Sequence, residues 1–468
     1  EDSVCEFSEW AGVGVAFKFI CAFDNDFGYD LLEEYGDLVA LGTVADIVSL
    51  KGENRIIVRS GLAFINAGLY DGTLRTGIKA LVEVSDNSGA LNSMGLAFRL
   101  SPRINAAGRL GSAERALKLL LCEDAEEARL IAEEISQLNS QRQSTESAIT
   151  EEAVKIIENN ADIKHRRVIV VSGESWHQGV IGIVASRIAE RYGKPCIVIS
   201  ENDEVSRGSG RSIEGFSLYD GLSYCSDVLV QYGGHVLAAG LSIDKDRISE
   251  FRDKINEYAE TIEPIVGVLH IDCKLNPAGI DVDMVSSLQI LEPYGAENPQ
   301  PLFGLYGMVV SAVQGVGNGK HTRLSLKKNG VSLSAIMFSV APEDLPYVMG
   351  DKVDVAVKLS ENEYQGKTQV SIQVKDIRLS GYDEDKIIAA ERLYEDFCKE
   401  KENSDRFMGK IIVDRAFCGD VYRFIKNNGG WKYSSEMLCY RLGLPEERLA
   451  DCSIALDVLS ELGIIILK

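Results

Sequence analysis

The sequence predicts a multidomain α/β protein, and three observations support this fold class. The chain has 468 residues, which corresponds to roughly three domains at about 150 residues each. Residues 167–200 show a strand–helix–strand pattern, whereas residues 267–379 alternate apolar and polar side chains with the period of two that is typical of strands. Within residues 11–264, one long amphipathic segment separates two parts that each have the pattern of a domain. Such a segment is typical of a helix that connects two domains.

The first part of the chain alternates apolar segments with turn signals. Here the pattern predicts a buried strand over Leu38–Val48 and a helix over Arg115–Leu121. The chain starts at Glu1 without methionine and enters an apolar segment almost at once, as though it began inside a domain. We therefore expect a fragment in which residues 1–123 are the C-terminal part of a larger α/β domain.

The long amphipathic segment covers residues 124–160. From Asp124 to about Asn159 it contains no proline or glycine, and apolar or small residues recur at spacings of mostly three and four. This pattern predicts one helix of about 36 residues, or ~54 Å, that connects two domains. Two helices with a break near Ser140–Ser144 would give nearly the same pattern.

A second α/β domain is expected over residues 161–264. Its first elements form a βαβ unit with a parallel pair of strands. We place these elements at Arg167–Ser172, Val180–Tyr192 and Cys196–Ser200. Glycine-rich turns are expected at residues 208–215 and 233–240, before an amphipathic helix from about Arg247 to Thr261.

Residues 265–380 are expected to form a small β-barrel of the oligonucleotide-binding type, although a sandwich of similar size has the same pattern. Lys328-Asn329-Gly330 is a hairpin signal between two alternating runs. The other strands are expected at residues 303–313, 351–360 and 367–378. Residues 381–468 are predicted to be a helical or winged-helix-like module, with a terminal strand at Ile464–Leu467.

Composition and charge exclude several classes of protein. The formal net charge is −22, so the chain cannot coat a polyanion over its whole surface, and any nucleic-acid contact must be local. Ten cysteines occur without a Cys-x-x-Cys pair, which excludes a zinc site or a dense disulfide framework and favours the reducing cytoplasm. No run approaches the ~18 apolar residues of a membrane span, so no membrane partner is expected.

Several short motifs carry residues suited to binding phosphate. Arg103, Asn105 and Arg109 lie among small residues that let a ligand approach the backbone, although surface salt bridges explain the arginines equally well. The Gly208–Ser212 segment combines a glycine-rich backbone with two hydroxyl groups and a guanidinium group, which suits an anion-binding nest or a flexible hairpin tip.

Two histidines and one aspartate are further candidates. His235 lies between Gly-Gly and Ala-Ala-Gly, where small residues leave room for a ligand. His177 precedes a helix N-terminus, which favours anions, although a structural role is the stronger interpretation for it. Asp46 ends an apolar segment, where a helix cap is commoner than a metal ligand. No Walker loop, nucleophile elbow, His-Glu-x-x-His or Rossmann fingerprint is present.

The order of the motifs resembles that of the RecJ family of single-stranded-DNA-specific 5′→3′ exonucleases, which belong to the DHH phosphoesterase superfamily. The resemblance covers about residues 10 to 380. The matching motifs are Gly-Thr-Val-Ala-Asp, Ser-Pro-Arg-Ile-Asn-Ala-Ala-Gly-Arg, Trp-His-Gln-Gly-Val-Ile-Gly-Ile-Val-Ala-Ser-Arg, Gly-Ser-Gly-Arg-Ser, Gly-Gly-His-Val-Leu-Ala-Ala-Gly and Leu-Glu-Pro-Tyr-Gly-Ala-Glu-Asn-Pro-Gln-Pro. It implies a DHH catalytic domain, a DHH-associated domain and an oligonucleotide-binding (OB-fold) domain.

The resemblance also implies a centre of two divalent ions, Mn²⁺ or Mg²⁺, that activates water for hydrolysis of a phosphodiester. Asp46 corresponds to one metal ligand and catalytic residue, and no Asp-His-His triplet occurs in the chain. His235 would act at the phosphate that is cleaved. The DNA- and phosphate-binding residues would be Arg103, Asn105, Arg109, Ser209, Arg211 and Ser212, together with His235.

The barrel would hold the rest of the strand by stacking of aromatic side chains and by local basic contacts. Its candidates are Tyr294, Phe303, Tyr306 and His321, although such residues in a small barrel are more often part of the core.

The leading hypothesis is therefore a 5′→3′ exonuclease of DNA repair and recombination, of which this fragment alone is inactive. The alternatives are a non-catalytic module that binds single-stranded nucleic acid and a DHH phosphodiesterase of short oligonucleotides. The expected ligand is single-stranded DNA. A single-strand DNA-binding protein and a helicase are the protein partners considered, and a monomer is expected.

Overall fold

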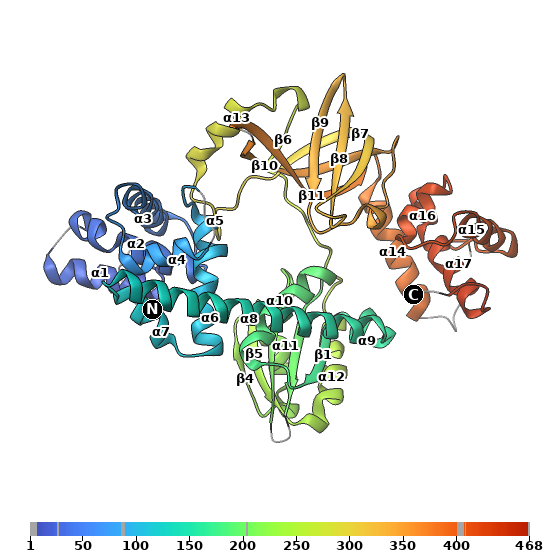
Figure 1. Cartoon of the computed structure of the whole chain (residues 1–468). Helices are drawn as coiled ribbons and strands as arrows, with labels where there is room; N and C mark the ends of the chain where they lie inside the picture. The colour runs from blue at the N-terminus through green and yellow to red at the C-terminus, as the bar shows by residue number, and fades with distance from the viewer. Residues whose placement is uncertain are drawn as a thin grey trace. The chain divides into compact units, whose positions relative to one another are not determined.

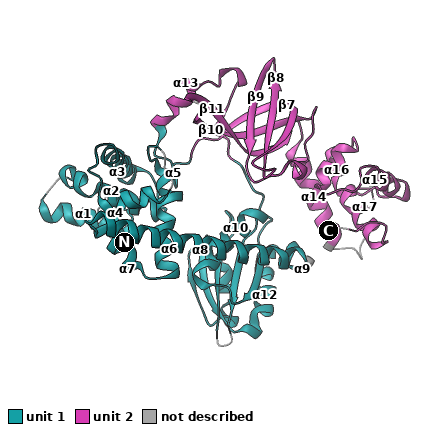
Figure 2. Cartoon of the chain, viewed as in Figure 1, with its two compact units in different colours: residues 1–269, 291–299 teal, residues 270–290, 300–468 magenta. Residues whose placement is uncertain are grey.

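The computed structural model describes residues 7–25, 28–85, 89–202, 205–364, 366–399, 407 and 409–466. The chain folds into two compact units (Figures 1 and 2). Unit 1 comprises Glu1–Leu269 together with Leu291–Pro299, and unit 2 comprises His270–Ile290 together with Gln300–Lys468.

In the described residues up to Leu121, the regular secondary structure of unit 1 is entirely helical. Its elements are α1 (Gly12–Asp24), α2 (Tyr29–Ala45), α3 (Gly52–Asp71), α4 (Thr76–Glu83), α5 (Ser93–Gly95), the π-helical turn η1 (Leu96–Leu100), α6 (Ser101–Leu110) and α7 (Ala113–Leu121). The helix predicted over Arg115–Leu121 is confirmed as the main part of α7.

The strand predicted over Leu38–Val48 is wrong, because these residues form the second half of α2 and the loop after it. Helix α2 packs against α1, α3, α6 and η1, so that consecutive residues such as Val39, Ala40 and Leu41 are all buried. A helix buried on most sides has no one-sided apolar stripe, and its sequence is then hard to distinguish from a buried strand.

The long segment forms one continuous helix, α8 (Ala125–Glu158), followed by the short helix α9 (Ala161–His165). The Asp124 side chain caps α8 by accepting a hydrogen bond from the Glu127 amide, and no break occurs at residues 140–144. One end of α8 packs into the core of the helical part, and the other packs against the second domain. The single-helix prediction is confirmed.

The second domain contains a five-stranded sheet with the order β1-β2-β3-β5-β4. Strands β1 and β2 are parallel, which confirms the βαβ unit, and the other neighbours are antiparallel. Helices α8 and α10 pack on one face, whereas α11 and α12 pack on the other. The elements are β1 (Ile169–Glu174), α10 (Gln178–Tyr192), β2 (Cys196–Glu201), β3 (Ser206–Arg211), α11 (Leu218–Tyr224), β4 (Gln231–Gly234), β5 (Ala238–Ile243) and α12 (Ile248–Glu260).

The glycine-rich turns predicted at 208–215 and 233–240 are wrong in part, because their glycines lie mainly inside strands. Gly208 and Gly210 belong to β3 and face the core. A Cβ atom on Gly208 would lie 2.9 Å from Leu241. Glycine is needed here for close packing of the sheet rather than for a turn.

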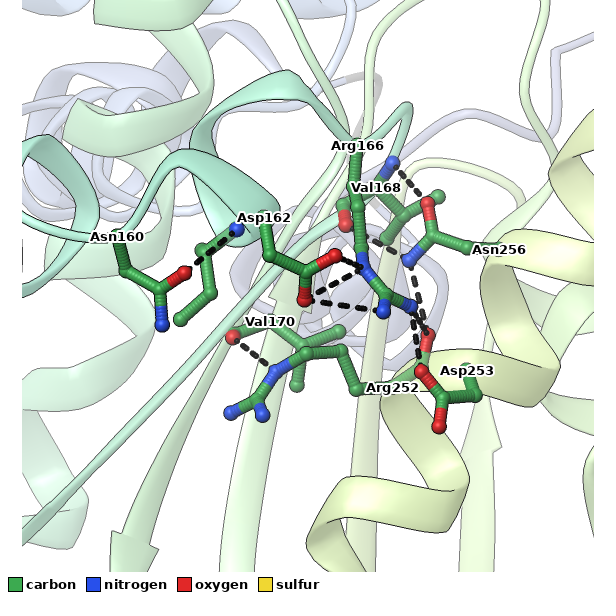
Figure 3. Close-up of polar contacts among 9 residues, drawn as sticks. Asn160, Asp162, Arg166, Val168, Val170, Arg252, Asp253 and Asn256 are labelled. Carbon is green, nitrogen blue, oxygen red and sulfur yellow. Dashed lines mark hydrogen bonds and ion pairs between the residues drawn. The ribbon is translucent and has the colours of Figure 1, made fainter. Parts of the chain in front are cut away.

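The free edge of β1 is covered by side chains of α12 (Figure 3). The Asn256 amide group accepts from the Val168 N–H at 2.9 Å and donates to the Val168 carbonyl at 3.0 Å. The Arg252 guanidinium group donates to the Val170 carbonyl at 3.1 Å. These contacts satisfy backbone groups that an edge strand otherwise leaves unpaired.

We expect Asn256→Ala to lower the free energy of unfolding by about 1–3 kcal/mol, because it leaves buried backbone groups of Val168 without partners. Urea denaturation measures this loss. Glu257→Ala is the matched control, since Glu257 lies on the same helix but is exposed. Equal stability of the two variants would show that the Asn256 contacts contribute nothing.

Unit 2 begins with the predicted barrel. Its strands have the order β11-β9-β8-β7, and β10 pairs with both β11 and β7, which closes the barrel and excludes a sandwich. The predicted hairpin joins β8 and β9 through Asn329 and Gly330, both with positive φ. The elements are β6 (Cys273–Lys274), α13 (Val282–Ser287), β7 (Phe303–Val316), β8 (His321–Lys328), β9 (Val331–Met337), β10 (Lys352–Tyr364) and β11 (Lys367–Leu379).

The last module is helical, as predicted. It consists of α14 (Glu384–Lys399), α15 (Arg415–Asn427), α16 (Ser435–Arg441) and α17 (Leu449–Glu461). The Arg441 guanidinium group ties α16 to the barrel through both oxygens of Asp351, at 2.7 and 2.5 Å. The predicted strand at Ile464–Leu467 is absent from residues 464–466, and Leu467 lies outside the described residues.

Within the described ranges, no helix combines the length and the apolar character that crossing a membrane requires.

Candidate functional site

The candidate site is built around the N-terminus of α10. His177 is the N-cap residue of this helix, and its Nδ1 atom accepts a hydrogen bond from the Gly179 N–H at 3.1 Å. The His177 ring therefore caps the helix, which is a structural role. The helix has 15 residues, so its aligned peptide dipoles favour an anion near its first turn.

Arg109 reaches this helix end from the C-terminus of α6. Its Nη1 atom donates to the Gly179 carbonyl at 3.1 Å, while the rest of the side chain is exposed. A Cβ atom on Gly179 would lie 2.8 Å from the Arg109 carbonyl oxygen. The absence of a side chain at Gly179 therefore lets the two helices meet.

Strand β3 supplies two further groups, Ser209 and Arg211. They are two residues apart in the strand and so point to the same face. A Cβ atom on Gly182 of α10 would lie 3.0 Å from the Ser209 hydroxyl and 3.3 Å from Arg211 Nη2. The first turns of α10 therefore pack directly beside both polar groups.

The electrostatics of this cluster favour a bound anion. Burial, together with the positive charge of Arg109, lowers the pKa of the Arg211 guanidinium group from its ordinary value. In the described part of the chain, no carboxylate lies within 4.0 Å of the guanidinium nitrogens of Arg109 or Arg211. A phosphate group would neutralise both arginines and accept hydrogen bonds from each.

His235 lies at the same end of the sheet. Its backbone N–H donates to the Ala238 carbonyl at 2.8 Å, and Ala238 is the register partner of Arg211. Two residues further along the strands, Ser209 pairs with Gly240, which pairs with Gly233. A Cβ atom on Gly233 would meet nothing within 4 Å, so this row is an open backbone surface beside Ser209.

Ser212 and Arg103 do not join this cluster. The Ser212 hydroxyl already donates to the Phe216 carbonyl at 2.7 Å. Arg103 lies six residues before Arg109, which places the two on different sides of α6. Its guanidinium group donates to the Val84 carbonyl at 3.2 Å and to the Ser136 hydroxyl at 3.2 Å, so it ties α6 to α8. The structure therefore does not bring Arg103 together with Arg109.

Asn105 is exposed on α6, as Arg109 is, and lies one turn before it. It adds a polar group to the surface of α6 that leads to the α10 N-terminus.

Asp46 stands apart as the exposed C-cap residue of α2, followed by Ile47 with a φ of 57°. In the described part of the chain, no group of three or more His, Cys, Asp or Glu side chains could hold a metal ion. Asp46 supplies at most one ligand, so these residues do not fit the implied pair of ions.

The aromatic candidates of the barrel differ in exposure. Phe303 is buried in the barrel core, and Tyr294 is buried in unit 1. Tyr306 is half-buried, with the Lys274 ammonium 5.2 Å from its ring centre. His321 stands 5.2 Å from Phe338, ring centre to ring centre, and Phe338 is exposed. Sequence reasoning missed Phe338, which lies just after an alternating run.

Two family models match this chain. The DHHA1 domain matches residues 165–261, which contain the sheet and α10, and the RecJ OB domain matches residues 271–376, which contain the barrel. A phosphate-favouring α/β domain is thus followed by a barrel of the oligonucleotide-binding type.

Curated relatives extend the match. The chain is 35% identical over 401 residues to the single-stranded-DNA-specific exonuclease RecJ of Salmonella typhimurium, which covers 80% of this chain and 68% of the relative. It is 34% identical to that of Bacillus subtilis, over 80% of this chain and 47% of the relative. The chain therefore belongs to the RecJ family, and it spans about half the length of the Bacillus and Thermus thermophilus relatives.

Solved structures of RecJ also match the fold of this chain. The crystal structure of RecJ from Thermus thermophilus in complex with Mg²⁺ matches with a TM-score of 0.68 at 33% identity. The match covers 80% of this chain and 57% of that one, and the Mn²⁺ complex gives the same score.

Proposed function

We propose that this chain binds single-stranded DNA by a phosphate group and forms the strand-binding part of a 5′→3′ exonuclease that hydrolyses phosphodiester bonds. The observation that carries this proposal is the juxtaposition of Arg109 and Arg211, without a carboxylate partner in the described residues, at the N-terminus of α10. The relatives' names and the OB domain support single-stranded DNA as the ligand.

In this proposal each residue has one task. Arg109 and Arg211 bind the oxygens of the phosphate, and the Ser209 hydroxyl group donates a hydrogen bond to it. The first N–H groups of α10 complete the site. His235 lies beside the site at the open end of the sheet, where the next phosphate of the strand would pass. By the family resemblance Asp46 would be one metal ligand, and no step of the reaction is assigned to it.

The two-ion centre, the role in DNA repair and recombination and the cytoplasmic location remain predictions. The solved relatives were crystallised with Mg²⁺ and with Mn²⁺, which supports a divalent ion for the family. Because the described residues of this chain do not assemble a metal site, we assign no step of the hydrolysis to a metal ion.

The alternative of a non-catalytic binding module is favoured by that same absence of a metal-ligand cluster among the described residues. The two functions differ in turnover. Incubation of a 3′-labelled single strand with the purified chain and Mn²⁺ should show binding without shortening if the chain is a binding module. Release of nucleotides from the 5′ end would establish the exonuclease instead.

We expect binding to weaken with salt, because phosphate contacts release counterions. For single strands the slope of log K against log salt concentration is about −0.7 per neutralised phosphate, so two contacts lower affinity about five- to tenfold between 50 and 200 mM salt. The acidic surface has little influence, since the Debye length is about 8 Å at 0.15 M. Fluorescence anisotropy measures this slope, and a flat response contradicts phosphate binding.

A further inference from the structure

Trp176 lies between the end of β1 and His177, the N-cap residue of α10. Only 3% of its surface is exposed, and it belongs to the buried cluster that α8, α10 and the sheet share. Ile181, the fourth residue of α10, belongs to the same cluster. A buried apolar residue before the N-cap that packs with the fourth helical residue is a hydrophobic staple, which fixes the angle at which the chain enters the helix.

The backbone of Trp176 is held by strand β2. Ser200, a buried residue of this strand, donates a hydrogen bond from its hydroxyl group to the Trp176 carbonyl at 2.5 Å. Ser200 is also the register partner of Gly173 in the parallel pair of β1 and β2. A Cβ atom on Gly173 would overlap Trp176 Cε2, so the indole ring occupies the space that a side chain there would need. The carbonyl and the ring of Trp176 are therefore both fixed against the ends of these strands.

The indole N–H group of Trp176 is held by helix α8. Its Nε1 atom donates to the Glu152 carboxylate at 3.0 Å. Glu152 is exposed on α8, so it adds this hydrogen bond without being part of the apolar core. Helix α8 packs against α10 (Figure 1), and the hydrogen bond joins α8 to the residue that precedes the cap of α10.

The orientation of Trp176 affects the phosphate site through the residues that follow it. The His177 ring caps the Gly179 N–H, and the Gly179 carbonyl accepts a hydrogen bond from Arg109. Without its acceptor, the indole N–H would be left unpaired at the edge of the buried cluster, which costs free energy. The ring relieves this cost by turning toward water. Such a turn displaces His177 and the first N–H groups of α10 from the positions in which they face the phosphate.

We propose that Trp176, held by Glu152, is a positioning residue that directs the first N–H groups of α10 at the phosphate. The inference rests on the proposed function. Neither side chain contacts the phosphate, so the effect on binding is indirect and depends on the hydrogen bond between the indole and the carboxylate. The indole N–H requires an acceptor oxygen rather than a negative charge, so an amide group can take the place of the carboxylate.

Substitutions on α8 test this proposal by anisotropy titration of a short 5′-phosphorylated, 3′-labelled oligothymidylate. Glu152→Ala removes the acceptor and should weaken binding about three- to tenfold, the change that corresponds to one ordinary hydrogen bond. Glu152→Gln keeps an acceptor oxygen and should bind within about twofold of the unaltered chain. Glu151→Ala is the matched control, because it removes the same charge from the neighbouring exposed position, and it should also stay within about twofold.

Two results of this titration would overturn the proposal. The first is an affinity of Glu152→Ala equal to that of the unaltered chain. The second is an equal loss in Glu152→Ala and Glu152→Gln, since the acceptor oxygen would then have no effect.

Fluorine NMR separates positioning from a general loss of structure. The chain contains Trp10, Trp176 and Trp431, and labelling with fluorotryptophan gives each of them a signal, of which Trp176→Phe removes the one to be followed. Saturating oligothymidylate should shift the Trp176 signal of the unaltered chain. Glu152→Ala should displace this signal before the strand is added and leave the Trp10 and Trp431 signals in place. A Trp176 signal that does not respond to the bound strand contradicts the coupling of this ring to the phosphate site.

The outcomes also separate this proposal from the proposed function. Binding of the short strand that does not depend on Arg211 in the unaltered chain rejects the phosphate site. Arg211-dependent binding that Glu152→Ala leaves unchanged rejects the positioning role of Trp176 alone.

Discussion

Replacement of Arg211 by alanine is expected to weaken binding of a 5′-phosphorylated single strand by about 10- to 100-fold. A hydrogen bond to a charged group contributes about 1.5–3 kcal/mol, and each 1.4 kcal/mol is a tenfold change in affinity. Arg211 is half-buried beside Ser209 and the first turns of α10, so the alanine removes its charge and its hydrogen-bond donors from the site. Anisotropy titration of a 3′-labelled oligothymidylate measures the change.

Arg207 provides the matched control for this experiment. It lies on the same strand and the same face as Arg211, but it is exposed and lies four residues before Arg211 in β3. Arg207→Ala should change the affinity less than threefold, which is roughly 0.65 kcal/mol. Arg211→Lys should recover part of the loss, since it keeps the charge without the planar fork. Equal losses for Arg207→Ala and Arg211→Ala would indicate a diffuse electrostatic effect instead of a site.

Glu146→Ala is expected to lower the free energy of unfolding by about 3–5 kcal/mol, the range typical of removing one partner of a buried ion pair. Only 1% of the Glu146 side chain is exposed. One carboxylate oxygen binds Arg142 at 2.5 Å, and the other contacts Arg187 of α10. The alanine therefore leaves Arg142 buried without its counterion, next to Asn139 in the middle of α8. Urea denaturation measures the loss.

Two further variants define the cause. Glu151→Ala removes an exposed glutamate from the same helix and should change stability by less than about 0.5 kcal/mol. Arg142→Met combined with Glu146→Leu removes both buried charges and should recover most of the loss, because apolar residues of similar volume can replace a buried pair. Arg187 is more than half exposed and can turn to solvent. A Glu146→Ala protein as stable as the parent would contradict a structural role for this pair.

The long helix and the barrel could be predicted because their signals are local. An unbroken three-to-four spacing is enough to define α8, and alternation with an Asn-Gly turn is enough to define the β8–β9 hairpin. The strand predicted at Leu38–Val48 failed because burial on most sides of α2 removes the helical period from the sequence. The sequence pattern indicates a turn at the glycines of β3, because the packing of Gly208 against Leu241 and of Gly210 against Leu218 is a tertiary contact that local sequence does not show.

The candidate site was predictable only in part. Ser209 and Arg211 share a face because alternate residues of any strand do, and His177 caps α10 as its position before the helix indicated. Which arginine of α6 joins them depends on tertiary structure. Arg109 reaches α10 because Gly179 leaves room, whereas Arg103 turns to α8. The four-residue sequence Gly179–Gly182 was the available signal for the close approach of α10 to its neighbours.

The most direct test of the phosphate site is a crystal structure of this chain with a short 5′-phosphorylated oligothymidylate. The expected result is a phosphate group within hydrogen-bond distance of the Arg109 and Arg211 guanidinium groups and of the Ser209 hydroxyl, in front of the first turn of α10. A strand bound elsewhere, with both guanidinium groups facing only water, would contradict the proposed function.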